Sequence, residues 1–117
     1  MAQLSAPPAV PWRTTMRERP VAAPRDTTWA VLLDLLGSGP DDLSVEPPWR
    51  HVRRLTVPGV ELCERTVTLR DDGPACHLAW SAGLTAEVDD TAADALLDRL
   101  AADGEQLLER VARGATT

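Results

Sequence analysis

The side chains best suited to chemistry in this chain are one arginine, two histidines and two cysteines within alternating apolar segments. Arg65 alternates with Cys63 and Val67, so it is the one charge predicted on the apolar face of its segment. A guanidinium in that position either binds a ligand carboxylate or phenolate, or packs its stem along Trp80 with its head at the rim. The sequence leaves both interpretations open.

The two histidines fall on different faces of their segments. His77 is predicted on a polar face, whereas His51 shares a segment with Trp49 and Arg53 and can point inward. This makes His51 the candidate for acid–base chemistry. Neither histidine has a carboxylate or cysteine at metal-ligand spacing, and no catalytic motif is present. We therefore predict no metal site and no cofactor.

The two cysteines, Cys63 and Cys76, form neither a CxxC pair nor a disulfide framework. We expect both to be reduced and to pack as small buried apolar residues. The sequence shows no signal-peptide core and no apolar run long enough for stable membrane insertion. These features together predict a cytoplasmic protein.

The composition indicates a globular domain and argues against a nucleic-acid partner. Hydrophobic residues make up 44% of the 117 residues and charged residues 26%, which are ordinary values for a folded protein. The formal net charge is −6, whereas phosphate binding requires a basic surface. The chain has four Trp but neither Phe nor Tyr. We therefore predict that nucleic acid is not a partner.

A long amphipathic helix is predicted over residues 91–113. Apolar residues recur there at three- and four-residue steps, Thr91 and Asp94 resemble a capping box, and Gly114 supplies a stop signal. Gly104 falls on the apolar side, where glycine costs up to about 1 kcal/mol relative to alanine. Either another group packs very closely against it, or the glycine keeps a space open.

The remaining segments predict an α+β fold with about four antiparallel strands packed against the long helix, and one shorter helix after the first strand. Residues 14–22 favour a strand, and a helix opens at Ala23-Pro24 and ends at Gly37. Residues 49–57, 61–70 and 75–84 alternate as strands. We place one domain at residues 14–113, between tails at residues 1–13 and 114–117.

The segment Asp71-Asp72-Gly73-Pro74 is a hairpin signal, and it sets the predicted pairing of the last two strands. If Arg70 pairs with Ala75, one face holds the pairs Leu69/Cys76, Val67/Leu78, Arg65/Trp80 and Cys63/Ala82. That face is apolar apart from Arg65, so it should lie against the core and the long helix. The opposite face is polar and should meet water.

Three phrases in this order resemble the START-like helix-grip superfamily, also called SRPBCC, of the polyketide cyclase/dehydrase and lipid-transport type. The phrases are ERPVAAPRDTTWAVLLDL, VEPPWRHVRRL and VELCERTVTLRDDGPACHLAWSA. The resemblance implies a cavity between the sheet and the long helix. The residues that would line it are Arg65, Val67, Leu69, Leu78, Trp80, Leu100 and Gly104, with ordinary core packing as the alternative for the apolar ones.

The chain departs from this family between the first helix and the strand at residues 49–57. Family members place a second helix and about three strands there, but only residues 37–45 intervene. The surviving strands would be contiguous, in the order first, last, last but one and last but two. The strand from Trp49 to Val57 would then be an unpaired edge, and the cavity is expected to be shallow, filled in or completed by a second subunit.

Three functions are compatible with these patterns. The leading interpretation is the binding of a small hydrophobic or amphipathic molecule without chemistry. The second, implied by the resemblance, is a polyketide cyclase- or dehydratase-like enzyme that uses His51 as its acid–base group. The third is an interaction or structural module that has lost its cavity and forms a homodimer through the Trp49–Val57 edge. A cavity over Arg65 and Trp80 would favour the first interpretation.

Overall fold

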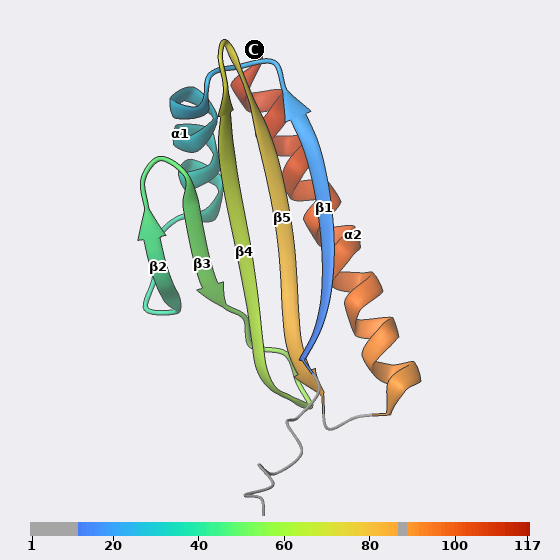
Figure 1. Ribbon diagram of the computed structural model, residues 1–117. Helices are drawn as coiled ribbons and strands as arrows, with labels where there is room; N and C mark the ends of the chain where they lie inside the picture. Colours follow the sequence, from blue (N-terminus) through green and yellow to red (C-terminus); the bar gives the residue numbers. More distant parts are fainter. Residues whose placement is uncertain (1–11, 87–88) are drawn as a thin grey trace, which may run out of the picture.

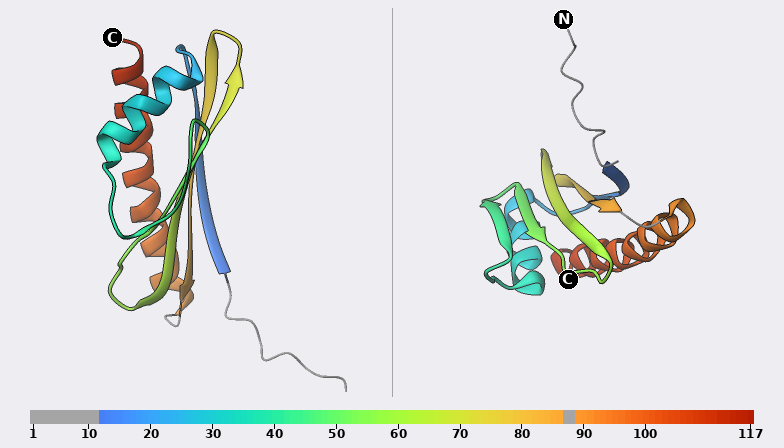
Figure 2. Two further views of the ribbon diagram at one scale, coloured as in Figure 1. Left: turned by 90° about the vertical axis from the view of Figure 1, so that its left-hand side faces the viewer. Right: turned by 90° about the horizontal axis from the view of Figure 1, so that it is seen from below.

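The computed structural model describes residues 12–86 and 89–117, and its central feature is a five-stranded antiparallel sheet. The strands are β1 (Trp12–Val21), β2 (Asp42–Glu46), β3 (Arg50–Arg54), β4 (Val60–Asp72) and β5 (Ala75–Ala86). Two helices, α1 (Arg25–Leu36) and α2 (Asp90–Ala115), lie on the same face of the sheet (Figure 1, Figure 2). The predicted α+β class is confirmed, with one strand more than expected.

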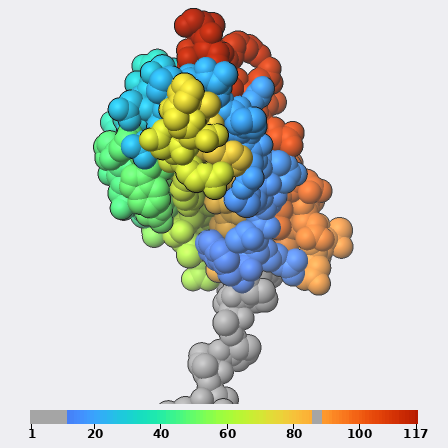
Figure 3. All heavy atoms as spheres, turned by 45° about the horizontal axis from the view of Figure 1, so that its top comes forward, coloured from blue at the N-terminus to red at the C-terminus, as the bar shows by residue number. Residues whose placement is uncertain are grey.

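The order of the strands across the sheet is β1-β5-β4-β3-β2. The first strand and the last three are therefore neighbours in the predicted order, and β2 extends the sheet beyond them. The long β4–β5 hairpin forms the middle of the sheet, and its tip stands forward between β1 and the β2–β3 side of the molecule (Figure 3). β1 begins at Trp12, so it includes two residues that the sequence assigned to the tail; the rest of that tail lies outside the described residues.

The core lies between the inner face of the sheet and the two helices. The sheet contributes Val67, Leu69, Leu78 and Trp80, α1 contributes Trp29 and Leu32, and α2 contributes Ala101, Leu108 and Val111. α2 contacts β1 and β5, while α1 contacts β4, β5 and α2. Each large apolar side chain buried in this way stabilises the fold by about 1.5–3 kcal/mol, so this one cluster holds both helices on the sheet.

The ends of the helices differ in detail from the prediction. Asp89 rather than Thr91 caps α2, because its carboxylate accepts a hydrogen bond from the Ala92 N–H at 2.8 Å. The helix continues past Gly114 to the buried Ala115. α1 ends at Gly37 as predicted, where a φ of 64° favours glycine.

The β4–β5 hairpin is tighter than predicted. Residues 73–74 alone form the turn, and the residue pairs are shifted by two positions. Arg65 consequently lies opposite Ala82 instead of Trp80, and the other predicted pairs shift in the same way. Because side chains alternate with a period of two, this shift leaves each of them on its predicted face.

The sequence predicted no strand among the intervening residues 37–45, but β2 begins there, at Asp42. It pairs with β3, which occupies the middle of the strand expected at residues 49–57 and which also pairs with β4. β3 is therefore an interior strand, and it has no free edge through which a second copy could pair. The prediction of an unpaired edge from Trp49 to Val57, on which the expected homodimer contact rested, is therefore wrong.

Complementary charges hold β2 against β3. Arg50 forms an ion pair with Glu46 at 2.8 Å, and Arg53 forms one with Asp42 at 2.6 Å. Glu46 pairs with Arg50 in the strand register, and Asp42 pairs with Arg53. Opposite charges directly across an antiparallel pair are stabilising, so these arginines explain why such a short strand is placed here.

Candidate functional site

A cavity of about 370 Å³ lies between α1, α2 and the inner face of the sheet. Its apolar wall comprises Leu35, Leu36, Leu55, Trp80, Leu100 and Leu107. Its polar wall comprises Arg53, Arg65, Asp103 and Arg110. The volume is at the lower end of the range of about 300–1,000 Å³ that is usual for small-molecule sites. The chain therefore has a cavity where the sequence placed one, above Arg65 and Trp80.

Arg65 carries a buried guanidinium whose hydrogen-bonding capacity is largely unused. Its Nε and Nη2 atoms are buried and have no hydrogen-bond partner among the residues that the structure describes. Burial lowers the pKa of Arg65, and the positive charge of Arg53 acts in the same direction. Since desolvation of a charge is costly unless hydrogen bonds compensate it, Arg65 is the group in this cavity that an anion would stabilise.

Arg53 lies opposite Arg65 on the neighbouring strand, but its guanidinium is engaged within the protein. Its Nε donates to Asp42 Oδ1 at 2.6 Å, and its two Nη atoms donate to the carbonyls of Leu36 and Gly37 at 2.9 and 3.0 Å. These carbonyls end α1 and would otherwise lack partners. Arg53 therefore fixes the end of α1 beside the cavity, and its guanidinium is already engaged within the protein.

Asp42 and His51 extend the polar row on the inner face. His51 is 0% exposed, and its Nε2 lies 3.4 Å from Asp42 Oδ1, yet neither ring nitrogen has a hydrogen bond to any described residue. Burial lowers the pKa of His51, although the Asp42 carboxylate opposes this effect. The hydrogen bond from Arg53 lowers the pKa of Asp42. At neutral pH the ring is consequently neutral and the carboxylate is charged.

The cavity brings together only some of the residues that the resemblance suggested. Arg65, Trp80 and Leu100 line it. Val67, Leu69 and Leu78 are at most 2% exposed and lie in the core cluster instead of on the cavity wall. His51 points to the inner face, as the sequence allowed, but it is not on the wall either.

Gly104 accommodates Trp80 instead of lining the cavity. A Cβ atom at position 104 would lie 2.6 Å from Trp80 Cε3, which is closer than real Cβ contacts. The indole ring therefore rests directly against the backbone of α2. Of the two interpretations of this glycine, close packing agrees with the structure. The contact fixes the position of Trp80 between the helix and the cavity.

Asp42, Arg53, Asp103 and Arg110 are site residues that the sequence interpretation missed. A signal existed for the α2 pair, because Leu100, Asp103, Leu107 and Arg110 recur at three- and four-residue steps and so share one side of a helix. For Asp42 and Arg53, the signal was the acidic charge of one segment and the basic charge of the other. Because the sequence did not predict β2 as a strand, it gave no reason to pair the two residues.

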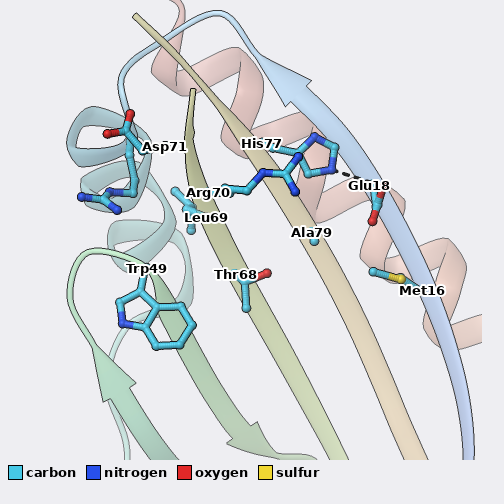
Figure 4. A pocket seen from close by; sticks show the side chains of 10 residues that line it. Met16, Glu18, Trp49, Thr68, Leu69, Arg70, Asp71, His77 and Ala79 are labelled. Carbon is cyan, nitrogen blue, oxygen red and sulfur yellow. Dashed lines mark ion pairs between the residues drawn. The ribbon is translucent and has the colours of Figure 1, made fainter. Parts of the chain in front are cut away.

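A second, wider hollow of about 630 Å³ lies on the opposite face of the sheet. Figure 4 shows Trp49 and Met16 on opposite sides of Thr68, with His77 directed toward Glu18. Trp49 and Met16 are 44% and 53% exposed, and the His77 and Glu18 side chains lie 3.2 Å apart. His77 is thus on the outer face, as its alternation predicted.

The ionic groups around this outer hollow are exposed or paired. Arg70 is exposed. The Arg25 side chain is 33% exposed and lies 4.0 Å from Asp26, although its buried Nε has no hydrogen bond to any residue that the structure describes. Solvent and a counterion therefore stabilise charge on this face. The inner cavity is the stronger candidate site because two guanidinium nitrogen atoms of Arg65 are buried there without a hydrogen-bond partner among the described residues.

Other classes of site find little support in the described part of the chain. No group of three or more His, Cys, Asp or Glu side chains gathers there in a way that could hold a metal ion. Cys63 and Cys76 are both buried free thiols, and burial raises the pKa of Cys63, which disfavours its thiolate. None of the helices described is long and apolar enough to cross a membrane.

A sheet that wraps one face around a long C-terminal helix, with a cavity between them, defines the helix-grip fold of START-like proteins. The solution structure of CalU16 from Micromonospora echinospora has this fold, with a TM-score of 0.73 and 19% identity over 98% of this chain and 77% of CalU16. The helix-grip architecture expected from the sequence is thereby confirmed as a fold.

Two further solved structures resemble the chain. The protein MLL2253 from Mesorhizobium loti matches with a TM-score of 0.67 and 16% identity, over 87% of this chain and 96% of that protein. The di-domain ARO/CYC BexL from the BE-7585A biosynthetic pathway matches with a TM-score of 0.61 and 15% identity, over 89% of this chain and 46% of BexL. The chain matches no family model and no curated protein sequence.

Proposed function

We propose that the protein binds a small amphipathic molecule whose anionic group pairs with Arg65 and whose apolar part lies against Trp80. The observation that carries this proposal is that two buried guanidinium nitrogens of Arg65, at the wall of a cavity, have no hydrogen-bond partner among the described residues. A carboxylate or phenolate there would form charge-assisted hydrogen bonds to its free N–H groups. The leucines of α1 and α2 would cover the remaining apolar surface of the ligand.

The charges of the wall favour an anion over a neutral ligand. Three guanidinium groups and one carboxylate line the cavity, and Asp42 neutralises one of the three, Arg53. A neutral hydrocarbon would displace water from Arg65 without replacing its hydrogen bonds, which is unfavourable. The expected ligand therefore has at least one negative charge beside an apolar body.

This function agrees with the observations better than the two alternatives considered from the sequence. A cyclase-like reaction would need an acid–base group at the cavity wall, and the candidate His51 is fully buried away from it. An assembly module without a cavity disagrees with the volume of about 370 Å³. BexL is an ARO/CYC protein by name, but 15% identity supports only a common fold.

Isothermal titration calorimetry with a matched pair of aromatic ligands tests the proposal. The ligands are 2-naphthoate, which carries a carboxylate, and naphthalene-2-carboxamide, which has nearly the same shape without charge. We expect saturable binding of 2-naphthoate with one molecule per chain. We expect the amide to bind at least about tenfold more weakly, because it loses the charge-assisted hydrogen bonds to Arg65.

The Arg65→Met variant identifies the site. Its affinity for 2-naphthoate should fall by about ten- to a hundredfold, since it removes the charge but keeps an apolar side chain of similar length. Arg54→Met is the matched control, because Arg54 is exposed on the outer face of β3 and should not affect binding. Failure of the wild type to bind 2-naphthoate, or unchanged affinity in Arg65→Met, would refute the proposal.

A further inference from the structure

A second polar group without partners lies in the same row as Arg65. His51 is 0% exposed, and both of its ring nitrogens lack hydrogen bonds among the described residues. We propose that the cavity takes up an organic anion together with one proton, and that His51 carries this proton. The inference rests on the proposed function, because it requires an anion beside Arg65.

The sheet register brings the two groups close together. Arg53 pairs with Arg65, and His51 pairs with Val67, so His51 and Arg65 are diagonal neighbours on the inner face. Diagonal neighbours in an antiparallel pair lie about 7–8 Å apart. In a buried site of low dielectric, charges at such a separation still interact appreciably. An anion bound beside Arg65 would therefore interact electrostatically with the His51 ring.

A proton acceptor and a counterion are already in position. The Nε2 atom of His51 lies 3.4 Å from Asp42 Oδ1, so a protonated ring would have a carboxylate to pair with. His51 is not on the cavity wall and would act through its charge instead of by contact with the ligand. His51 is thus not a catalytic residue, because it would affect the ligand only through the charge of its ring.

Burial disfavours the proton on the His51 ring, and the charges around the ring add to or oppose this effect. The groups that act on His51 are Asp42 from β2, Arg53 from β3 and Arg65 from β4. The charged residues of α1, Arg25, Asp26 and Asp34, are not among them. Without ligand, two positive charges face one negative charge, and this excess opposes a further positive charge on the ring. An anion at Arg65 cancels the excess and makes protonation more favourable.

The experiment measures proton uptake directly. Calorimetric titrations of 2-naphthoate in buffers with different ionisation enthalpies give the number of protons bound with each ligand. We expect proton uptake that increases as the pH falls below about 7, and an affinity that rises by up to about tenfold per pH unit. Naphthalene-2-carboxamide brings no charge, so its binding should show neither effect.

Two histidine variants distinguish the possible outcomes. His51→Gln should bind 2-naphthoate without proton uptake, whereas His77→Gln should behave like the wild type. Because the chain has two histidines, the His77→Gln protein has one histidine ring signal, which reports the pKa of His51 by NMR with and without ligand. We expect the ligand to raise that pKa.

The result that overturns the inference is tight binding of 2-naphthoate with no proton uptake and no movement of the His51 signal. In that case the proposed function would stand. If 2-naphthoate does not bind to the wild type at any pH, both the function and the inference are wrong. The NMR titration of His77→Gln decides the matter even if His51→Gln fails to fold.

Discussion

Arg65 shows how one residue can serve binding while weakening the unliganded fold. Two of its guanidinium nitrogens are buried without a partner in the described part of the chain, and an apolar side chain of similar size would avoid that desolvation. We expect Arg65→Met to raise the free energy of unfolding by about 1–2 kcal/mol in the absence of ligand. Chemical denaturation measures this difference. Arg54→Met, at an exposed position, should change it by less than about 0.5 kcal/mol, and destabilisation by Arg65→Met would contradict the assignment.

The residues of the site were predictable from the sequence only where simple alternation decides their position. Arg65, Trp80 and His51 lie on the predicted face, because a strand repeats every two residues whatever its partner. Whether a side chain on that face reaches the cavity depends on the position of the helices. Alternation contains no such information, and for this reason Val67 and Leu78 were assigned to the site although they lie in the core.

At the scale of elements, Arg53 joins three segments by means of one side chain. It bonds to Asp42 of β2 and to the Leu36 and Gly37 carbonyls at the end of α1. We expect Arg53→Ala to lower the free energy of unfolding by about 2–4 kcal/mol, because the partly buried carboxylate loses its partner along with the helix cap. Arg53→Lys should restore only part of this loss, since an ammonium group lacks the fork of the guanidinium.

Arg50→Ala provides the control for Arg53→Ala. Arg50 also pairs with an acidic residue of β2, but its side chain is 36% exposed and that of Glu46 is 43% exposed. Exposed pairs contribute at most about 1 kcal/mol, so this variant should remain close to the wild type in chemical denaturation. Equal losses for the two variants would show that Arg53 has no special role at the end of α1.

The contact between α2 and β5 predicts an unusual effect of a helix-favouring substitution. Gly104→Ala should lower the free energy of unfolding by about 1–3 kcal/mol, although alanine is the better helix former, because the added Cβ would overlap with Trp80. A double-mutant cycle with Trp80→Leu tests the cause. If Gly104→Ala is as destabilising in the Trp80→Leu background as in the wild type, the clash with Trp80 is not its origin.

The elements themselves were predictable to the extent that local pattern determines them. Both helices and the β4–β5 hairpin follow from their periodicity and turn residues. β2 escaped prediction because its five residues follow a segment rich in Gly, Pro and Asp, and precede Pro47-Pro48. A strand of that length is stabilised by charges on β3 instead of by its own pattern.

At the scale of the whole molecule, the buried polar row makes stability depend on pH. Burial lowers the pKa of His51 from its ordinary 6.5, so below about that pH the unfolded chain binds a proton that the folded chain does not. Stability should therefore fall as the pH drops from about 6.5 toward the folded-state value, by up to about 1.4 kcal/mol per pH unit. Urea denaturation at a series of pH values measures this slope.

Histidine variants identify the group that causes this dependence of stability on pH. In the His51→Gln variant the slope between about pH 6.5 and 5 should become shallower, whereas it should persist in His77→Gln. Asp42 adds a separate loss at lower pH: its pKa lies below the ordinary 3.8, so its stabilising contribution disappears as the pH falls through that lowered value. An unchanged slope in His51→Gln would show that another group is responsible.

The close packing of Trp80 against Gly104 restricts how related sequences can diverge at these two positions. The two positions are 24 residues apart in the chain but are in direct contact, so the glycine cannot change freely while the tryptophan is kept. A lineage can replace the tryptophan by a smaller residue while the glycine remains. Replacement of the glycine by any larger residue must follow that step and not precede it. In an alignment of relatives, we expect glycine at the helix position wherever tryptophan occupies the strand position.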